Sequence, residues 1–128
     1  ASDRQELQAR VNVGEYTPGA EIFVSIHCNA FSNPASNGME TYYYAGSPKG
    51  ERLATLLNEE LEKAGGLFNR GVKTANFYVI KHSSMPATLA ELAFVTNPQE
   101  EQLLASPAYQ MKLAEGIARA ISRYFSGN

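Results

Sequence analysis

The sequence of 128 residues has one cysteine, no run of basic residues and no long apolar segment. A single cysteine, Cys28, excludes an internal disulfide and a zinc site built from several thiolates. The longest apolar runs fall well short of the roughly 20 residues that a membrane-spanning helix needs. The net charge of −2 and the scattered lysines and arginines argue against a nucleic-acid-binding surface. No Ser-His-Asp order, phosphate-binding glycine loop or HExxH signature is present.

The composition favours one packed domain. Hydrophobic residues make up 44% of the chain and charged residues 19%, which supplies enough apolar surface for a core and is untypical of disorder. The sequence contains no internal repeat, no low-complexity segment and no second domain. We therefore treat residues 1–128 as a single domain.

Strand-like and helical patterns alternate along the chain. The expected helices cover 3–13, 48–64, 98–104 and 107–125, the expected strands 21–27, 38–44, 77–80 and 87–92, and the expected loops 28–37, 69–73 and 81–86. Capping boxes at Ser2–Gln5 and Asn97–Glu100 mark two of the helix starts. The alternation predicts an α/β fold with three αβα layers, in which helices cover both faces of a mostly parallel central sheet.

The segment 21–27 is apolar on both faces of a period-two pattern, which predicts a strand buried on both sides. His27 and Asn29 follow at its C-terminal end, where ligands bind in open α/β sheets. Glu91 lies inside another apolar strand, between leucine and alanine neighbours. A buried carboxylate needs a cation, a metal or a reacting group nearby, because burying its charge alone costs several kcal/mol.

Each of these polar residues also has a purely structural interpretation. Glu91 alone is equally compatible with a buried ion pair, and His27 with a core histidine bonded to a backbone carbonyl, but their joint position at C-terminal strand ends favours a function. Cys28 points to the opposite face from His27 and is expected to be a small packing residue. His82 either lines the cleft or is an exposed loop histidine. The tyrosines 42–44 either pack at a sheet edge or form an aromatic wall beside a polar substrate.

Several segments stand in an order that resembles a known family. They are residues 25–30 (SIHCNA), 38–44 (GMETYYY), 69–73 (NRGVK), 77–80 (FYVI) and 85–101 (MPATLAELAFVTNPQEE), together with the opening helical segment. In combination they resemble the zinc-dependent N-acetylmuramoyl-L-alanine amidases of bacterial cell-wall turnover, the group often called amidase type 3. The resemblance covers almost the whole chain.

The resemblance implies a zinc hydrolase. In such amidases the histidine of the Ser-Ile-His segment binds Zn²⁺, which implies a metal ligand at His27. The glutamate of the Met-Pro segment is the catalytic carboxylate, which corresponds to Glu91. Asn29 would have a supporting role, and Asn29 and His82 are the candidates for the substrate cleft. The other two zinc ligands of the family, a histidine and a glutamate, follow its first strand, and this sequence has no counterpart of those segments.

We therefore expect residues 1–128 to be the C-terminal two-thirds of a catalytic domain, without its first strand, first helix and second strand. The chain alone is expected to bind Zn²⁺ weakly and to have negligible activity. The implied substrate is peptidoglycan, cut at the amide between the lactyl group of N-acetylmuramic acid and L-alanine. The resemblance also implies a secreted autolysin that acts as a monomer at the bacterial cell wall, without a nucleic-acid partner or a membrane span.

Two alternatives stay open on the sequence. One is a non-catalytic cell-wall binding or regulatory module with the amidase fold. The other is an unrelated α/β binding domain in which His27 and Glu91 form a buried ion pair and no metal is bound.

Overall fold

The computed structural model describes residues 3–127. In chain order the elements are α1 (Asp3–Glu15), β1 (Phe23–Asn29), β2 (Met39–Tyr43), α2 (Pro48–Gly65), β3 (Asn69–Thr74), α3 (Tyr78–His82), β4 (Ala87–Phe94), α4 (Pro98–Leu104) and α5 (Pro107–Ser126). No helix within this described range is long and apolar enough to cross a membrane.

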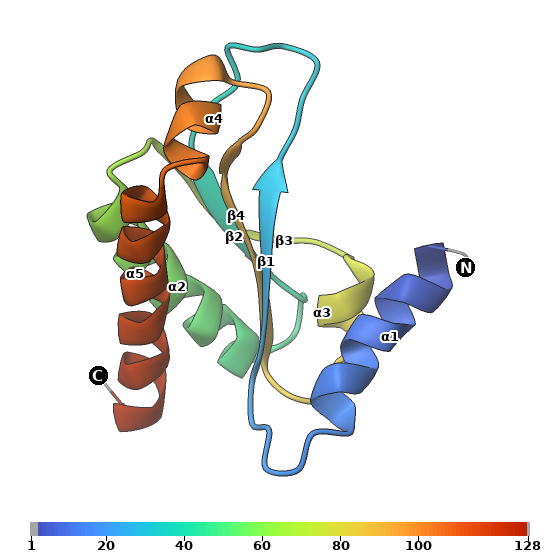
Figure 1. Cartoon of the computed structure of the whole chain (residues 1–128). Helices are drawn as coiled ribbons and strands as arrows, with labels where there is room; N and C mark the ends of the chain where they lie inside the picture. The colour runs from blue at the N-terminus through green and yellow to red at the C-terminus, as the bar shows by residue number, and fades with distance from the viewer. Residues whose placement is uncertain (1–2, 128) are drawn as a thin grey trace.

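The strands form one four-stranded sheet in the order β1-β4-β2-β3. β1 runs parallel to β4 and β2 runs parallel to β3, whereas β2 and β4 are antiparallel. Helices α2 and α5 lie on one side of the sheet, and α1 and α3 lie on the other (Figure 1). The predicted α/β fold, with helices packed on a mostly parallel sheet, is therefore confirmed.

Two apolar clusters join the helices to the sheet. On one face, leucines of α2 and α5 pack with Met39 of β2 and Ala90 of β4. On the other face, Val11 of α1 and Val79 of α3 pack with Leu89 of β4. Burying one large aliphatic side chain contributes about 1.5–3 kcal/mol, so each cluster fixes its helices firmly against the strands that carry the polar residues.

Polar side chains cap the starts of α2 and α4, which the sequence predicts as helices over 48–64 and 98–104. The Ser47 side chain accepts a hydrogen bond from the backbone amide of Gly50 and caps α2. Asn97 caps α4 by accepting from the amides of Gln99 and Glu100. Glu100 does not complete a capping box, because its carboxylate accepts from the amides of Phe94 and Gly38 instead. Ser2 of the other predicted box lies outside the described residues.

Two assignments made from the sequence are wrong. Residues 69–73, expected as a loop, belong to β3, and residues 77–80, expected as a strand, lead into the short helix α3. A short apolar run has no period that separates strand from helix, and here Val79 and Ile80 are buried against α1 and β4. Residues of β3 are mostly polar because the strand forms the outer edge of the sheet.

The prediction that β1 is buried on both sides is also wrong. β1 lies at the opposite edge of the sheet, with β4 as its neighbour. Ile26 is 44% exposed, because the helices that cover the centre of the sheet leave part of this edge strand open. Cys28 is exposed as well, so it is not the packing residue that the sequence indicates.

Candidate functional site

A row of three polar side chains crosses the sheet. His27 of β1 pairs in register with Glu91 of β4, and Glu91 pairs in register with Glu40 of β2. Residues directly opposite each other on neighbouring strands present their side chains on the same face. The structure therefore brings together His27 and Glu91, as the sequence predicts, and adds Glu40, which sequence reasoning missed.

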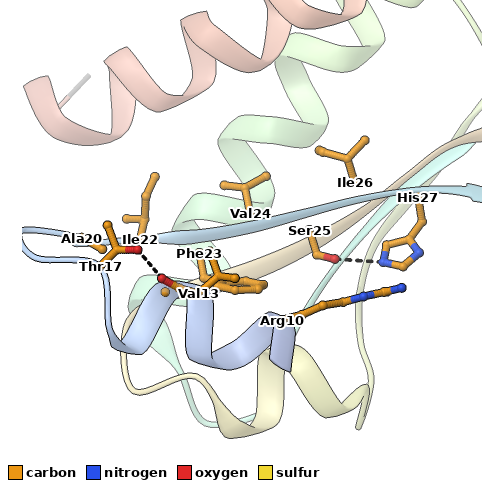
Figure 2. Close-up of a pocket in the computed structure, with 11 residues that line it drawn as sticks. Arg10, Val13, Thr17, Ala20, Ile22, Phe23, Val24, Ser25, Ile26 and His27 are labelled. Carbon is orange, nitrogen blue, oxygen red and sulfur yellow. Dashed lines mark hydrogen bonds between the residues drawn. The ribbon is translucent and has the colours of Figure 1, made fainter. Parts of the chain in front are cut away.

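His27 is half-buried beside α1. Its ring nitrogen Nε2 lies 2.8 Å from the hydroxyl oxygen of Ser25, so its partner among the described residues is this hydroxyl and not a backbone carbonyl. Figure 2 shows the ring beside Ser25, with the side chain of Arg10 reaching toward it from α1. Burial, and then the positive charge of Arg10, lower the pKa of His27. The imidazole is accordingly neutral at pH 7, which is the form that binds metal ions.

Glu91 has an unsatisfied carboxyl group. Its Oε2 atom is buried and has no hydrogen-bond partner within residues 3–127. Burial, and then the negative charge of Glu40, raise the pKa of Glu91 to about 7. Among the described residues the His27 ring contacts Ser25, and burial and Glu40, not His27, act on the pKa of Glu91, so the structure does not support the alternative of a buried His27–Glu91 ion pair. A carboxyl group with a pKa near neutrality can both accept and donate a proton at physiological pH.

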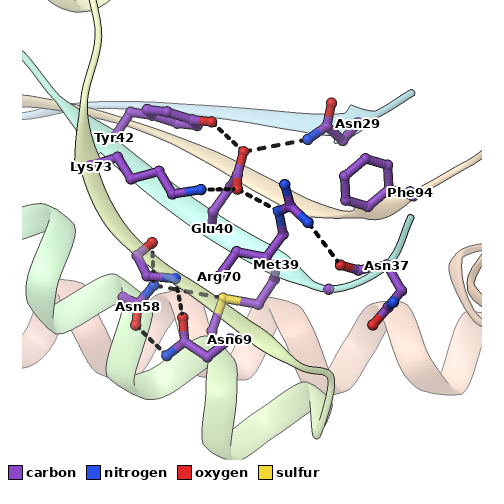
Figure 3. Close-up of polar contacts among 12 residues, drawn as sticks. Asn29, Asn37, Met39, Glu40, Tyr42, Asn58, Asn69, Arg70, Lys73 and Phe94 are labelled. Atoms are coloured by element: carbon purple, nitrogen blue, oxygen red, sulfur yellow. Dashed lines mark hydrogen bonds and ion pairs between the residues drawn. The ribbon is translucent and has the colours of Figure 1, made fainter. Parts of the chain in front are cut away.

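Glu40 is 2% exposed and lies at the centre of a hydrogen-bond network. Its Oε2 accepts from Arg70 Nε at 2.7 Å and from Lys73 Nζ at 2.9 Å. Its Oε1 accepts from the hydroxyl of Tyr42 and from the Asn29 amide at 3.4 Å. Figure 3 shows these donors converging on the carboxylate. Burial opposes its ionisation, but the hydrogen bonds from Tyr42, Lys73 and Arg70 outweigh burial and lower the pKa of Glu40.

The two candidates for the substrate cleft differ in their placement. Asn29 stands two residues after His27 on β1, and its side chain reaches Glu40 on the same face of the sheet. His82 ends helix α3, where its ring packs on Tyr78 with the ring centroids 4.1 Å apart. It takes no part in the hydrogen-bond network around Glu40. The structure therefore joins Asn29 to the row and leaves His82 outside it.

The tyrosines 42–44 at the end of β2 also separate. Tyr42 faces the row and packs edge-on against Phe77, with the ring centroids 5.0 Å apart. The hydroxyl of Tyr43 points the other way and donates to Glu51 of α2. Tyr42 therefore contributes an aromatic surface to the polar row, Tyr43 does not, and Tyr44 packs with Tyr42 against the apolar cluster under α1 and α3.

An open hollow of about 670 Å³ lies between α1 and β1. Arg10, Phe23, Ser25 and His27 are among the residues that line it (Figure 2). The hollow gives the His27 end of the row access from the free edge of the sheet.

The described residues offer only part of a metal site. No three His, Cys, Asp or Glu side chains within residues 3–127 are placed to hold one metal ion. A catalytic zinc ion takes three protein ligands and keeps a further position open. His27 supplies a neutral nitrogen donor and Glu91 an unpaired oxygen next to it, so these residues fit one side of such a site without completing it.

Comparison with known proteins places the chain in a family. The family model for N-acetylmuramoyl-L-alanine amidase (Amidase_3) matches residues 1–123. N-acetylmuramoyl-L-alanine amidase LytC of Bacillus subtilis is 40% identical over 121 residues, which are 93% of this chain and 24% of LytC. The germination-specific N-acetylmuramoyl-L-alanine amidase of the same organism is 32% identical over 123 residues, 95% of this chain and 52% of that protein.

Solved structures give the same result. The catalytic domain of CwlV, an N-acetylmuramoyl-L-alanine amidase from Bacillus (Paenibacillus) polymyxa var. colistinus, matches with a TM-score of 0.87 and 38% identity. The match covers 94% of this chain and 65% of that domain. The CwlD amidase of Clostridioides difficile, solved in complex with the GerS lipoprotein, matches with a TM-score of 0.89 and 31% identity over 100% of this chain and 68% of CwlD. This chain belongs to the N-acetylmuramoyl-L-alanine amidase family.

Proposed function

We propose that this chain supplies the catalytic glutamate and one metal ligand of a peptidoglycan hydrolase. The bond cleaved is the amide between the lactyl group of N-acetylmuramic acid and L-alanine. The observation that carries the proposal is geometric: the buried, unpartnered oxygen of Glu91 lies in register with His27. An unpaired buried carboxyl oxygen costs stability, and a reaction that uses it explains its retention.

We propose that residues 1–128 form the C-terminal two-thirds of one catalytic domain. The 65% share of the CwlV catalytic domain supports this division, as does the incomplete donor set of residues 3–127. The first strand, first helix and second strand of the family fold, with two further zinc ligands, would lie outside this chain. The chain alone would then bind zinc weakly and hydrolyse no cell wall.

His27 would hold the metal together with those further ligands. Members of the family are zinc-dependent in general, and a bound zinc ion polarises the scissile carbonyl and lowers the pKa of water to about 7. Glu91 would take the proton of the attacking water at its free oxygen and pass it to the leaving amine of L-alanine. Asn29 and Tyr42, both bonded to Glu40, would fix the polar wall beside Glu91.

The site of action would be the bacterial cell wall, because peptidoglycan lies outside the cytoplasmic membrane. The name of a further relative, the probable cell wall amidase LytH of Staphylococcus epidermidis, which is 31% identical over 106 residues, supports this location. We therefore propose a secreted autolysin that acts as a monomer.

Digestion of purified cell walls by a protein that contains this chain within the complete family domain tests the proposal. We expect new amino-terminal L-alanine to appear without new reducing sugar ends. Release of reducing ends, or of a different amino terminus, would show a different bond specificity and refute the proposal.

The incomplete donor set favours one other function for the chain by itself, a non-catalytic module that binds the cell wall. Sedimentation with purified cell walls separates the two functions. If the protein is a non-catalytic module, the complete domain should sediment with the cell walls and release no L-alanine ends.

A further inference from the structure

Two cations share one carboxylate at the centre of the polar row. Arg70 Nε and Lys73 Nζ both bind Oε2 of Glu40, at 2.7 and 2.9 Å. One carboxylate balances only one of these two positive charges, so the cluster carries a surplus positive charge.

Both cations keep unused hydrogen-bond donors. A lysine ammonium has three donors and an arginine guanidinium has five. Within residues 3–127, Lys73 donates only to Glu40, while Arg70 uses Nε for Glu40 and Nη1 for the backbone oxygen of Asn37 at 3.4 Å. The remaining donors can reach solvent, because the Lys73 side chain is 41% exposed and the Arg70 side chain 34% exposed.

The two cations are held in position on the face that carries His27 and Glu91. Lys73 pairs in register with Tyr42, which stands two residues from Glu40 on β2 and so shares its face. The Arg70 guanidinium lies over the Phe94 ring, 5.0 Å from its centroid, in addition to its bond to Glu40. Figure 3 shows both side chains on the opposite side of β2 from Met39 and Asn58. Donors fixed in this way bind an anion with little further loss of conformational freedom.

The distance from Glu91 limits what this pair can bind. Glu40 lies on the strand next to Glu91, and neighbouring strands are about 4.8 Å apart. An extended peptide covers about 3.3–3.6 Å per residue. Arg70 and Lys73 stand on β3, two strands from Glu91, and their side chains reach back to Glu40, so an anion on their free donors would lie roughly one to two strand spacings from Glu91. Such a group would therefore belong to a residue about one to three positions beyond the bond that is cut at Glu91.

We propose that Arg70 and Lys73 form a carboxylate-binding subsite for the stem peptide of peptidoglycan. The subsite takes the free α-carboxylate of the residue that follows L-alanine, and it distinguishes this carboxylate from a neutral carboxamide. The inference rests on the proposed function for the identity of the peptide. It concerns binding alone, so it does not require a metal or turnover.

The test is a comparison of two peptides by nuclear magnetic resonance titration of the 128-residue chain. Both peptides are L-Ala-γ-D-Glu-L-Lys with an amidated C-terminus, and they differ only in a free or an amidated α-carboxyl group on the second residue. We expect the free acid to bind about tenfold more tightly, because charge-assisted hydrogen bonds are about twice as strong as neutral ones. The amide resonances of β3 are expected to shift most.

Lys73→Met removes the charge and keeps the apolar stem, and it should reduce the preference for the free acid to less than about twofold. Lys112→Met, at an exposed position of α5 behind the other face of the sheet, is the matched control and should leave the preference unchanged. Equal affinities for the two peptides, no detectable binding of either, or an undiminished preference in Lys73→Met would overturn the inference. A preference for the free acid in a domain that fails to release L-alanine would refute the proposed function alone.

Discussion

Replacing Glu91 by glutamine should stabilise the metal-free chain while it removes the proposed catalytic group. Glutamine has nearly the same shape as glutamate and carries no ionisable group. The Glu91 carboxyl group is half-buried with one oxygen unpartnered, so its ionised form is disfavoured in the folded chain. In the unfolded chain the same group ionises freely, and this difference makes the effect depend on pH.

The magnitude follows from the pKa. A rise in the pKa of Glu91 from 4.5 to about 7 corresponds to an upper limit of about 3.5 kcal/mol, since one pKa unit is worth about 1.4 kcal/mol. Solvent reaches the half-buried group, so we expect about 1–2 kcal/mol. Because the folded-state pKa of Glu91 is raised, the native chain has its full stability below pH 4.5, where the carboxyl group is protonated. It loses this amount of stability as the pH rises through about 7 and the buried group ionises.

Urea denaturation in the presence of a chelator measures this effect. At pH 8 the Glu91→Gln chain should be about 1–2 kcal/mol more stable than the native chain, and near pH 4.5 the two should be equal within error. Glu115→Gln, at an exposed position of α5, is the control and should show no such pH dependence. A Glu91→Gln chain that is less stable than the native chain at pH 8, or a difference that does not change with pH, would refute the assignment of Glu91 as a strained carboxyl group.

Three further predictions follow from the same structure. Glu40→Gln leaves Arg70 and Lys73 without their counter-charge, so it should lower the free energy of unfolding by about 2–3 kcal/mol at pH 7. Because the pKa of Glu40 is lowered, the stability that this carboxylate contributes is present above pH 4.5 and disappears as the pH falls. Denaturation curves of the two chains with no such acid dependence would contradict this prediction. Gly116→Ala places a methyl group 2.9 Å from the Ala64 Cβ and 3.0 Å from the Glu60 backbone oxygen. This contact should force α5 away from α2 and lower the free energy of unfolding by about 1–3 kcal/mol. An unchanged melting temperature would contradict this prediction. His27→Ala in the complete domain should lose bound zinc, measured by emission spectroscopy, and full metal content would remove His27 from the ligand set.

Much of the fold could be predicted because local signals and the hydrophobic pattern agree. The capping residue Ser47, the following Pro48, the leucine stripe and the C-terminal Gly66 all indicate the same helix, and α2 has those limits. The helix α4 and the strand β4 were predicted for similar reasons. The segments 69–73 and 77–80 were misassigned because their structure depends on pairing with β2 and on packing against α1, which no short-range pattern encodes.

The candidate site was predicted only in part. His27 is predictable because it ends one apolar strand and Glu91 because it interrupts another, and the register of β1 with β4 brings them together. Glu40 lies inside β2, but the pattern of that segment is dominated by the three adjacent tyrosines, which indicate either packing at a sheet edge or an aromatic wall. Its partners Arg70 and Lys73 come from a segment read as a loop, so the buried network could not be foreseen. His82 was predicted on the assumption of a loop at a strand end, whereas it ends α3.

The central claim is that Glu91 moves the proton in an amidase reaction at a metal held partly by His27. Turnover of purified cell walls by the complete domain that carries Glu91→Gln, with its zinc content measured in the same preparation, tests this claim most directly. We expect zinc to be retained and release of L-alanine ends to fall by about two to four orders of magnitude. Hydrolysis near the native rate with zinc in place would contradict it.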